Sequence, residues 1–342
     1  MKKILLILPY FGKLPEFFDV WLQSAMNNRT IDFLILTDCN IAYKVSPNIK
    51  IVHKTFAEFR EMCQAAVDYP IALEKPYKLC DWRPLYQVVL KEYLKEYDFA
   101  GFVDCDTVLG DIRGMLTEKA LEKYSHFLCL GHLQLQKIND PNFEDVLEHV
   151  KAQGKYTLQY VLQHSQNFCV DELPYGIPLT YWQRHPKDFF CEYHPDGRPL
   201  YDELTPNYNQ FVDLYNDKDY LGRFYQLYHF YGRHENVVPF WKRVEHAKRK
   251  IRKKLHYRYD EGKLYRCYWI DGVYREEEII YVHLYKRKME VCITDLNHYY
   301  ILPHKFLPSV NKWVIWKETR PRFMHKFRIY WRRELKRIFQ ML

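Results

Sequence analysis

Apolar and polar residues alternate in blocks over the first hundred positions, and these blocks predict strands and helices in turn. Continuous apolar runs of strand length occur in "KKILLILPYF", "IDFLILTD" and "DFAGFVDCD", and "NIKIVHKT" contains a shorter one. Between them, apolar residues recur at helical spacing in "LPEFFDVWLQSAMNN", "FAEFREMCQAAV" and "LYQVVLKEYL". Strands that are apolar throughout and alternate with helices are typical of a parallel sheet buried on both faces. We therefore expect an α/β fold.

The pattern changes in the last third of the chain. The stretch "HYRYDEGKLYRCYWIDGVYREEEIIYVHL" alternates aromatic and polar residues, and Glu261-Gly262 and Asp271-Gly272 interrupt it with typical hairpin turn pairs. It predicts an antiparallel meander that ends at "YVHLYKRKM". We expect one globular domain over residues 1–302 and a basic amphipathic tail over residues 303–342.

Charge is concentrated at the end of the chain. Residues 320–342 hold eight Arg or Lys and one Glu, which accounts for +7 of the formal net charge of +8. Aromatic and aliphatic residues are interspersed among these cations, as in helices that bind an anionic membrane surface. The alternative is a solvated helix packed on the domain. The nearly neutral body carries no recognition motif for nucleic acid, so we expect no specific nucleic-acid partner.

Cysteine usage and the N-terminal segment indicate the compartment. The nine cysteines include no C-x-x-C pair, and their odd number favours a reducing environment over a disulfide framework. The opening "MKKILLILPYFGKLPEFF" resembles a signal peptide, but Pro9 interrupts its apolar run and no small-residue cleavage site follows. We interpret it as a first buried strand. No run approaches the roughly 20 apolar residues of a membrane span, and we expect a cytoplasmic protein, attached peripherally to the inner face of the cell membrane.

Two aspartates at the end of a predicted strand are the main chemical signal. Asp104 and Asp106 follow the apolar run "FAGFV", and Asp38 follows another such strand. Ligands of open α/β sheets bind beyond the carboxyl ends of the strands. Adjacent carboxylates repel each other and lose hydration there, so we expect a divalent cation between them. Mn²⁺ or Mg²⁺ held in this way bridges the phosphates of a nucleotide-sugar donor such as a UDP-sugar.

Two other interpretations use the same features. "DCDTV" also fits the first motif of haloacid-dehalogenase phosphatases, in which the first aspartate is a nucleophile and Mg²⁺ lies nearby. That fold needs a later paired acid, and the sequence contains no Asp-Asp pair. Aromatic residues make up 17% of the chain, which would suit a non-catalytic glycan-binding module. Such a module would leave the two aspartates without a role.

Four segments occur in a characteristic order along the chain: "KPYKLCDWRPLYQVVL", "YDFAGFVDCDTVLGDIRGML", "GHLQLQKIND" and "DEGKLYRCYWIDGVYREEEIIYVHLYKRKM". Together they resemble a little-characterised bacterial family of predicted glycosyltransferases from surface-polysaccharide gene clusters. The resemblance extends from the first strand to about residue 290. It implies a GT-A-like, Rossmann-like fold, a nucleotide-sugar donor and a divalent metal. It does not fix the sugar or the acceptor. From the strand-end aspartates, these motifs and the basic tail together, we expect a surface glycan as acceptor (capsule, O-antigen or lipopolysaccharide), free or lipid-linked.

The resemblance also assigns roles by position. Asp104 and Asp106 would hold the metal and the diphosphate, and Lys78, Asp81 and Arg83 of "KLCDWRP" would lie beside the nucleotide, with the tryptophan of that motif near the base. The alternative for "KLCDWRP" is a turn whose aspartate caps the following helix and whose cations are solvated.

A further analogy concerns "YVHLYKRKM". In glycogenin-like metal-dependent transferases, a C-terminal histidine completes the metal shell and a following lysine contacts the donor phosphates. His283, Lys286 and Lys288 are similar to that arrangement, with the imidazole as metal ligand and the cations on the diphosphate. The sequence departs from that motif because it lacks the glycine between histidine and lysine and the Pro-Trp that follows.

Two softer candidates complete the expected site. Gly131-His132 follows another apolar strand, where GT-A enzymes hold the donor or acceptor sugar. Asp171 and Glu172 lie in the Pro- and Gly-bounded loop "NFCVDELPYGIP". If the enzyme inverts configuration, one of them would deprotonate the acceptor hydroxyl. The alternative is an exposed acidic turn.

Overall fold

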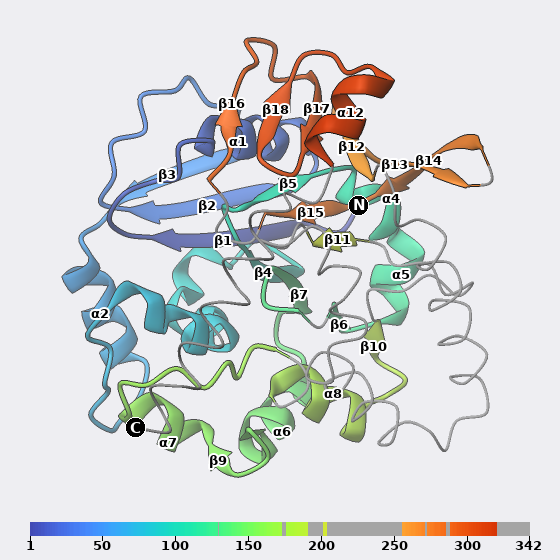
Figure 1. The fold of residues 1–342 in the computed structure, drawn as a ribbon. Helices are drawn as coiled ribbons and strands as arrows, with labels where there is room; N and C mark the ends of the chain where they lie inside the picture. Colours follow the sequence, from blue (N-terminus) through green and yellow to red (C-terminus); the bar gives the residue numbers. More distant parts are fainter. Residues whose placement is uncertain are drawn as a thin grey trace, which may run out of the picture.

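The computed structural model describes most of the chain (Figure 1). The described residues are 1–128, 130–172, 176–190, 201–203, 255–270, 272–284 and 288–319. The expected tail from residue 320 onward and Lys286 lie outside them.

A seven-stranded sheet forms the centre of the molecule, in the order β10-β6-β7-β4-β1-β2-β3. Neighbouring strands are parallel except at β7, which runs antiparallel to both β4 and β6. The expected α/β class is confirmed, and the antiparallel β7 is an addition to the expected parallel sheet. The strands are β1 (Ile4–Tyr10), β2 (Asp32–Thr37), β3 (Ile49–His53), β4 (Phe99–Val103), β6 (His126–Phe127), β7 (Leu133–Lys137) and β10 (Phe189–Phe190).

Both faces of this sheet are covered, which explains why its strands are apolar throughout. On β1, Leu6 and its alternate neighbours pack against Trp21 of α1, whereas Ile7 packs in a second core with Phe59 of α2. In Figure 1, α1 lies above the sheet and α2 below it. The helices around the sheet are α1 (Phe18–Asn27), α2 (Phe56–Ala65), α4 (Ile112–Met115), α5 (Glu118–Lys123), α6 (Pro141–His149), α7 (Leu158–Gln163) and α8 (Ile177–Arg184).

The helix expected over residues 85–94 is a correction. The chain instead forms a 3₁₀ helix, η1 (Pro76–Leu85), a single α-turn, α3 (Tyr86–Val89), and a short 3₁₀ turn, η2 (Lys91–Tyr93). Pro84 lies inside η1, where it supplies no backbone N–H and disfavours α-helical geometry at the preceding residue. The helical spacing that the sequence displays is therefore spread over three short turns that bury their apolar side chains against the sheet.

The C-terminal portion forms a second sheet, in the order β14-β13-β12-β17-β18-β16. The expected meander is confirmed for its first three strands, and the first turn has positive φ at both Glu261 and Gly262. This sheet continues past residue 302, because β18 pairs with β17. Its strands, and the helix that follows, are β12 (His256–Asp260), β13 (Lys263–Ile270), β14 (Val273–Ile279), β16 (Glu290–Val291), β17 (His298–Leu302), β18 (Lys305–Leu307) and α12 (Lys312–Glu318).

A small third sheet joins the two halves of the chain. It contains β11 (Tyr201–Glu203), β15 (Tyr281–His283) and β5 (Thr107–Leu109), in the order β11-β15-β5. The segment expected to end the meander thus leaves it and pairs with β5, directly after the two aspartates. A separate pair, β8 (Lys151–Ala152) and β9 (Tyr156–Thr157), forms a hairpin.

The lack of a side chain at Gly110 permits the C-terminal strands to pack against the end of β5. A Cβ atom at this position would lie 2.5 Å from the carbonyl oxygen of Ile279 and 2.9 Å from the side chain of Leu264. The Gly110 N–H also donates to the carbonyl of Ile280 (2.7 Å). Glycine therefore lets the C-terminal strands approach the end of β5. Within the ranges described, no helix is both long and apolar enough to cross a bilayer.

Candidate metal centre

Asp104 and Asp106 lie at the carboxyl end of β4, where the chain turns into β5. The Thr107 hydroxyl donates to the Asp104 carbonyl (2.7 Å) and closes this turn. Both carboxylates remain partly exposed, at 22% for Asp104 and 23% for Asp106. The turn thus presents the two acids to the open edge of the sheet, as the sequence predicted.

His283 reaches the same point from β15. In the antiparallel pairing of β15 with β5, His283 lies opposite Thr107, and the Leu284 N–H donates to the Asp106 carbonyl (2.7 Å). His283 Nε2 lies 3.3 Å from Asp106 Oδ1. One ligand atom from each of Asp104, Asp106 and His283 falls within 4.8 Å of the others.

These three side chains fit a divalent cation. Two carboxylate oxygens suit Mg²⁺ or Mn²⁺, and an imidazole nitrogen is a common ligand of first-row transition metals. Burial raises the pKa of Asp104 to about 7, with Arg83 opposing and Asp106 adding to the shift. A cation between the two carboxylates would remove this penalty, because it favours the charged form of each.

His132 supports the histidine of the cluster. Its ring stacks on that of His283 with a centroid separation of 3.5 Å, and its carbonyl accepts the Asp104 N–H (2.8 Å). Burial lowers the pKa of His132 well below its usual value. We expected His132 to contact a sugar. In the structure it packs directly behind His283, so it is placed to orient that ring.

Arg83 connects the aspartates to a second acidic pair. Its guanidinium donates from Nη2 to Asp104 Oδ1, and from Nη1 to Asp171 Oδ2 (2.7 Å) and to the Gly131 carbonyl. The flat group also lies over the ring of Phe102, 5.0 Å from its centroid. Arg83 was expected beside the nucleotide, and the structure places it at the edge of the cluster.

Asp171 and Glu172 lie next to Gly131. A Cβ atom on Gly131 would come within 2.6 Å of Glu172 Oε1 and 3.0 Å of Asp171 Oδ2. Asp171 is almost fully buried, which raises its pKa to about 8 against the opposing effect of Arg83. Glu172 is partly exposed. The two acids therefore lie beside Gly131, where Arg83 links Asp171 to Asp104, and Glu172 is the one nearer to solvent.

Lys78 and Asp81 lie in the interior rather than on the open face. They form an ion pair of 2.8 Å, with side-chain exposures of 2% and 0%. Asp81 accepts the N–H groups of Phe168 (3.0 Å) and Val170 (3.2 Å), and Lys78 donates to the carbonyl of Val161 (2.9 Å). Their expected contact with a nucleotide remains a prediction that this geometry does not favour. The pair instead anchors the loop that carries the second acidic pair.

The remaining candidates are spread around the site. Asp38 is exposed at the end of β2, and its carboxylate accepts the Gly12 N–H (2.9 Å). Trp82, expected near the base, is fully buried in the core below the sheet and so cannot stack on a ligand there. Lys288 is exposed, and its expected contact with phosphates remains a prediction. Sequence reasoning missed Tyr10, which ends β1. Burial raises the pKa of its hydroxyl to about 12, and the charge of Asp106 adds to the shift.

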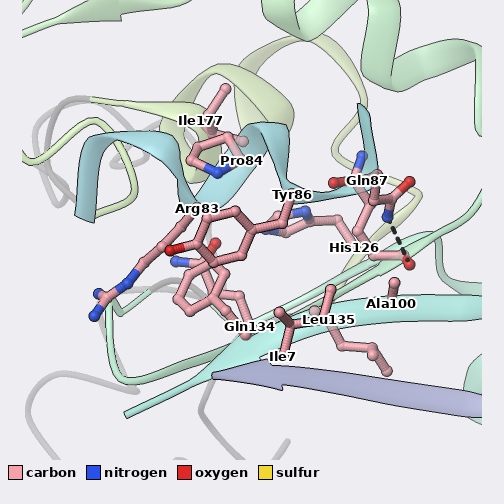
Figure 2. A pocket seen from close by; sticks show the side chains of 13 residues that line it. Ile7, Arg83, Pro84, Tyr86, Gln87, Ala100, His126, Gln134, Leu135 and Ile177 are labelled. Carbon is pink, nitrogen blue, oxygen red and sulfur yellow. Dashed lines mark hydrogen bonds between the residues drawn. The ribbon is translucent and has the colours of Figure 1, made fainter. Parts of the chain in front are cut away.

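A small cavity lies behind Arg83, between η1 and the sheet (Figure 2). His126 is buried in its wall, and neither ring nitrogen has a hydrogen-bond partner among the described residues. The cavity has a volume of about 20 Å³, which is close to the volume that a single water molecule needs. A nucleotide therefore cannot bind inside it. Figure 2 shows the Arg83 guanidinium extending away from the other labelled side chains.

Comparisons with known proteins place the chain in a family. The sequence model of the family of unknown function DUF6625 matches residues 6–310, and the chain belongs to this family. A search of curated proteins returned no match. Among solved structures, the chain is similar to mouse xyloside xylosyltransferase 1 in its apo form. The two share 10% identity with a TM-score of 0.36, over 64% of this chain and 91% of that one.

Proposed function

We propose that this DUF6625 protein is a metal-dependent glycosyltransferase. It would transfer a sugar from a nucleotide-sugar donor, with a UDP-sugar favoured, to a bacterial surface glycan such as capsule, O-antigen or lipopolysaccharide. The observation that carries the proposal is the cluster of Asp104, Asp106 and His283 at the open edge of a Rossmann-like sheet. A cation held by three side chains keeps further coordination positions for the phosphates of a donor.

The ligand set favours a transferase over the phosphatase that the sequence also suggested. Among the residues that the structure describes, the downstream group grouped with the two aspartates is the imidazole of His283, whereas the phosphatase requires a paired acid. The cluster also gives these residues a role that a glycan-binding module would not need.

The chain's own residues would divide the work as follows. Asp104, Asp106 and His283 would hold Mn²⁺ or Mg²⁺, which supplies positive charge to the diphosphate as it leaves. Arg83 would donate hydrogen bonds at the edge of the same anion. Glu172, partly exposed and beside Gly131, would accept the proton of the acceptor hydroxyl if the reaction inverts configuration.

The acceptor would be lipid-linked or membrane-associated. The described chain ends at α12, on which Trp313 and Trp316 are exposed beside Lys312 and Lys317. Tryptophan prefers the interface between headgroups and acyl chains. The basic segment 320–342 follows directly. We propose that this end of the protein binds the anionic inner face of the cell membrane.

The test is a thermal-shift panel of UDP-, GDP-, CMP- and dTDP-sugars, each with and without Mn²⁺. A ligand that binds only the native state raises its stability by RT ln(1 + [L]/Kd), so micromolar binding is visible. We expect a Mn²⁺-dependent rise in melting temperature with UDP-sugars that is lost in Asp104→Asn and Asp106→Asn. The control Asp68→Asn, which changes an exposed aspartate in the segment after α2, should keep the rise. A shift with free glycans alone would support the binding module instead.

A further inference from the structure

We infer that Arg83 is an internal counter-ion that competes with the divalent cation for Asp104. The inference rests on the proposed metal site and goes beyond it. In the structure the guanidinium pairs with Asp104 through Nη2. Asp104 would give up this pairing to ligate a cation, and Arg83 Nη2 would then be available to the donor diphosphate.

The two terminal nitrogens of Arg83 differ in how firmly their contacts hold them. Nη1 is held by Asp171 (2.7 Å), whose side chain is 1% exposed, and by the Gly131 carbonyl. The face of the guanidinium is held by Phe102. Nη2 instead donates to Asp104, which is 22% exposed and belongs to the candidate ligand cluster. Loss of the Nη2 contact would therefore leave the group anchored.

The charges explain why a counter-ion is needed. Asp104 and Asp106 are separated by one residue, and Asp171 and Glu172 lie beside Gly131. Arg83 contributes one positive charge that pairs with a member of each couple. A carboxylate oxygen that accepts a charge-assisted hydrogen bond gives up part of that interaction when it coordinates a metal. The Arg83–Asp104 pair therefore lowers the metal affinity of the free protein.

The same exchange would order the binding of ligands. In the structure, Nη2 donates to Asp104 and is not available to an anion. With a cation on Asp104, Nη2 of Arg83 would be available as a hydrogen-bond donor. The Arg83 side chain is 18% exposed at the edge of the cluster, where a metal-bound diphosphate would lie. Metal would thus bind first and the nucleotide second.

The experiment measures Mn²⁺ affinity by electron paramagnetic resonance, without nucleotide, in wild type, Arg83→Gln and Arg113→Gln. Arg113 is a matched control, since it is a largely buried arginine that pairs with Glu118 away from the aspartates. We expect Arg83→Gln to bind Mn²⁺ about tenfold or more tightly than wild type, and Arg113→Gln to equal wild type. An affinity in Arg83→Gln that is unchanged or weaker overturns the inference, because it makes Arg83 a neutral or supporting residue.

Further outcomes of this experiment distinguish failure of this inference from failure of the proposed function. If neither wild type nor Arg83→Gln binds Mn²⁺, the metal site fails and the inference fails with it. If wild type binds Mn²⁺ but Arg83→Gln is no tighter, only the inference fails. Should Arg83→Gln not fold, as judged by circular dichroism, Arg83→Lys decides. Its single ammonium cannot pair with both acids in the same way, so its Mn²⁺ affinity should still exceed that of wild type, and an unchanged value overturns the inference.

The release of Nη2 has its own readout. At saturating Mn²⁺, Arg83→Gln should bind UDP about tenfold more weakly than wild type, measured by calorimetry. The same substitution would then strengthen metal binding and weaken nucleotide binding, two opposite effects that a structural role would not produce. An unchanged UDP affinity would overturn the transfer of the guanidinium to the diphosphate.

Discussion

His283 Nε2 lies 3.3 Å from Asp106 Oδ1, although the two residues come from opposite thirds of the chain. Their contact depends on β15, which leaves the C-terminal meander to pair with β5. This contact adds an imidazole to the two carboxylates of the candidate metal cluster. Its contribution to metal binding can be measured without a sugar-transfer assay.

Replacing His283 by alanine should weaken Mn²⁺ binding by at least about tenfold. Removing a group that orients a metal ligand already lowers metal affinity by about this factor, and removing the ligand itself should lower the affinity at least as much. His132→Ala should have a smaller effect in the same direction, since it removes the stacked ring behind His283. Calorimetry without nucleotide is the measurement. The exposed His53 serves as a control. Equal Mn²⁺ affinities in His283→Ala and His53→Ala would remove the histidine from the metal site.

Asp81→Asn should destabilise the fold by about 3–5 kcal/mol, because it leaves the buried ammonium of Lys78 without its counter-charge. The loop held through the N–H groups of Phe168 and Val170 would also loosen. Urea unfolding gives the difference. In the matched variant Glu92→Gln, which breaks a solvent-exposed pair with Lys95, the free energy of unfolding should stay close to that of wild type. Similar losses in the two variants would refute the anchoring role.

Gly131→Ala should lower turnover about tenfold or more while leaving Mn²⁺ affinity nearly unchanged. The added methyl group would lie 2.6 Å from Glu172 Oε1 and push that carboxylate out of place. Glu172→Gln should reproduce the loss of turnover if the carboxylate acts as a base. Full activity in Gly131→Ala would show that the position of Glu172 is not important for the reaction.

Stability should fall as the solution is acidified below pH 6.5, in part because of His126. Burial lowers the pKa of this histidine to about 3. Between pH 6.5 and 3 the unfolded chain therefore binds a proton that the folded protein excludes, which favours unfolding. From pH 7 to pH 5 the expected loss from this group is about 2 kcal/mol.

The control for this prediction is His126→Phe. Phenylalanine retains the stacking on Tyr181 and Phe189 but cannot bind a proton. Its free energy of unfolding, measured in urea at pH 7 and pH 5, should decrease less than that of wild type. Parallel decreases in the two proteins would exclude His126 as a source of the acid sensitivity.

Deletion of residues 320–342 should release the protein from anionic liposomes and spare activity on a soluble acceptor. In the full-length chain, replacing Trp313 and Trp316 by alanine should weaken liposome binding by a smaller amount, since both side chains are exposed on α12. Co-sedimentation with phosphatidylserine vesicles at low and high salt measures this, because attraction between exposed charges is screened by salt. Liposome binding that the deletion leaves unchanged would contradict the membrane proposal.

The parts of the fold that the sequence predicted are those set by local pattern. Continuous apolar strands, the Glu261-Gly262 turn and the strand-end position of Asp104 follow from residues that are neighbours in the chain. The antiparallel direction of β7 does not, because it depends on pairing with β4. The helix expected over 85–94 failed for a similar reason, since burial against the sheet and Pro84 decide its geometry together.

For the candidate site, the sequence indicated which residues carry charge better than it indicated what each of them contacts. Lys78 and Asp81 were charged residues in a motif, and nothing local showed that each would neutralise the other in the interior. Arg83 was expected beside the nucleotide, and its bridge from Asp104 to Asp171 joins segments that the sequence separates. Such pairings are fixed by tertiary structure and leave no periodic signal.

The pairing of β15 with β5 also has a consequence for biosynthesis. A ribosome-bound chain exposes Asp104 and Asp106 early, yet its imidazole ligand emerges only after β14 has been translated. Domains generally fold as units when enough of the chain has left the ribosome. The nascent polypeptide would therefore lack one side of the candidate coordination shell until β15 has left the ribosome and paired with β5.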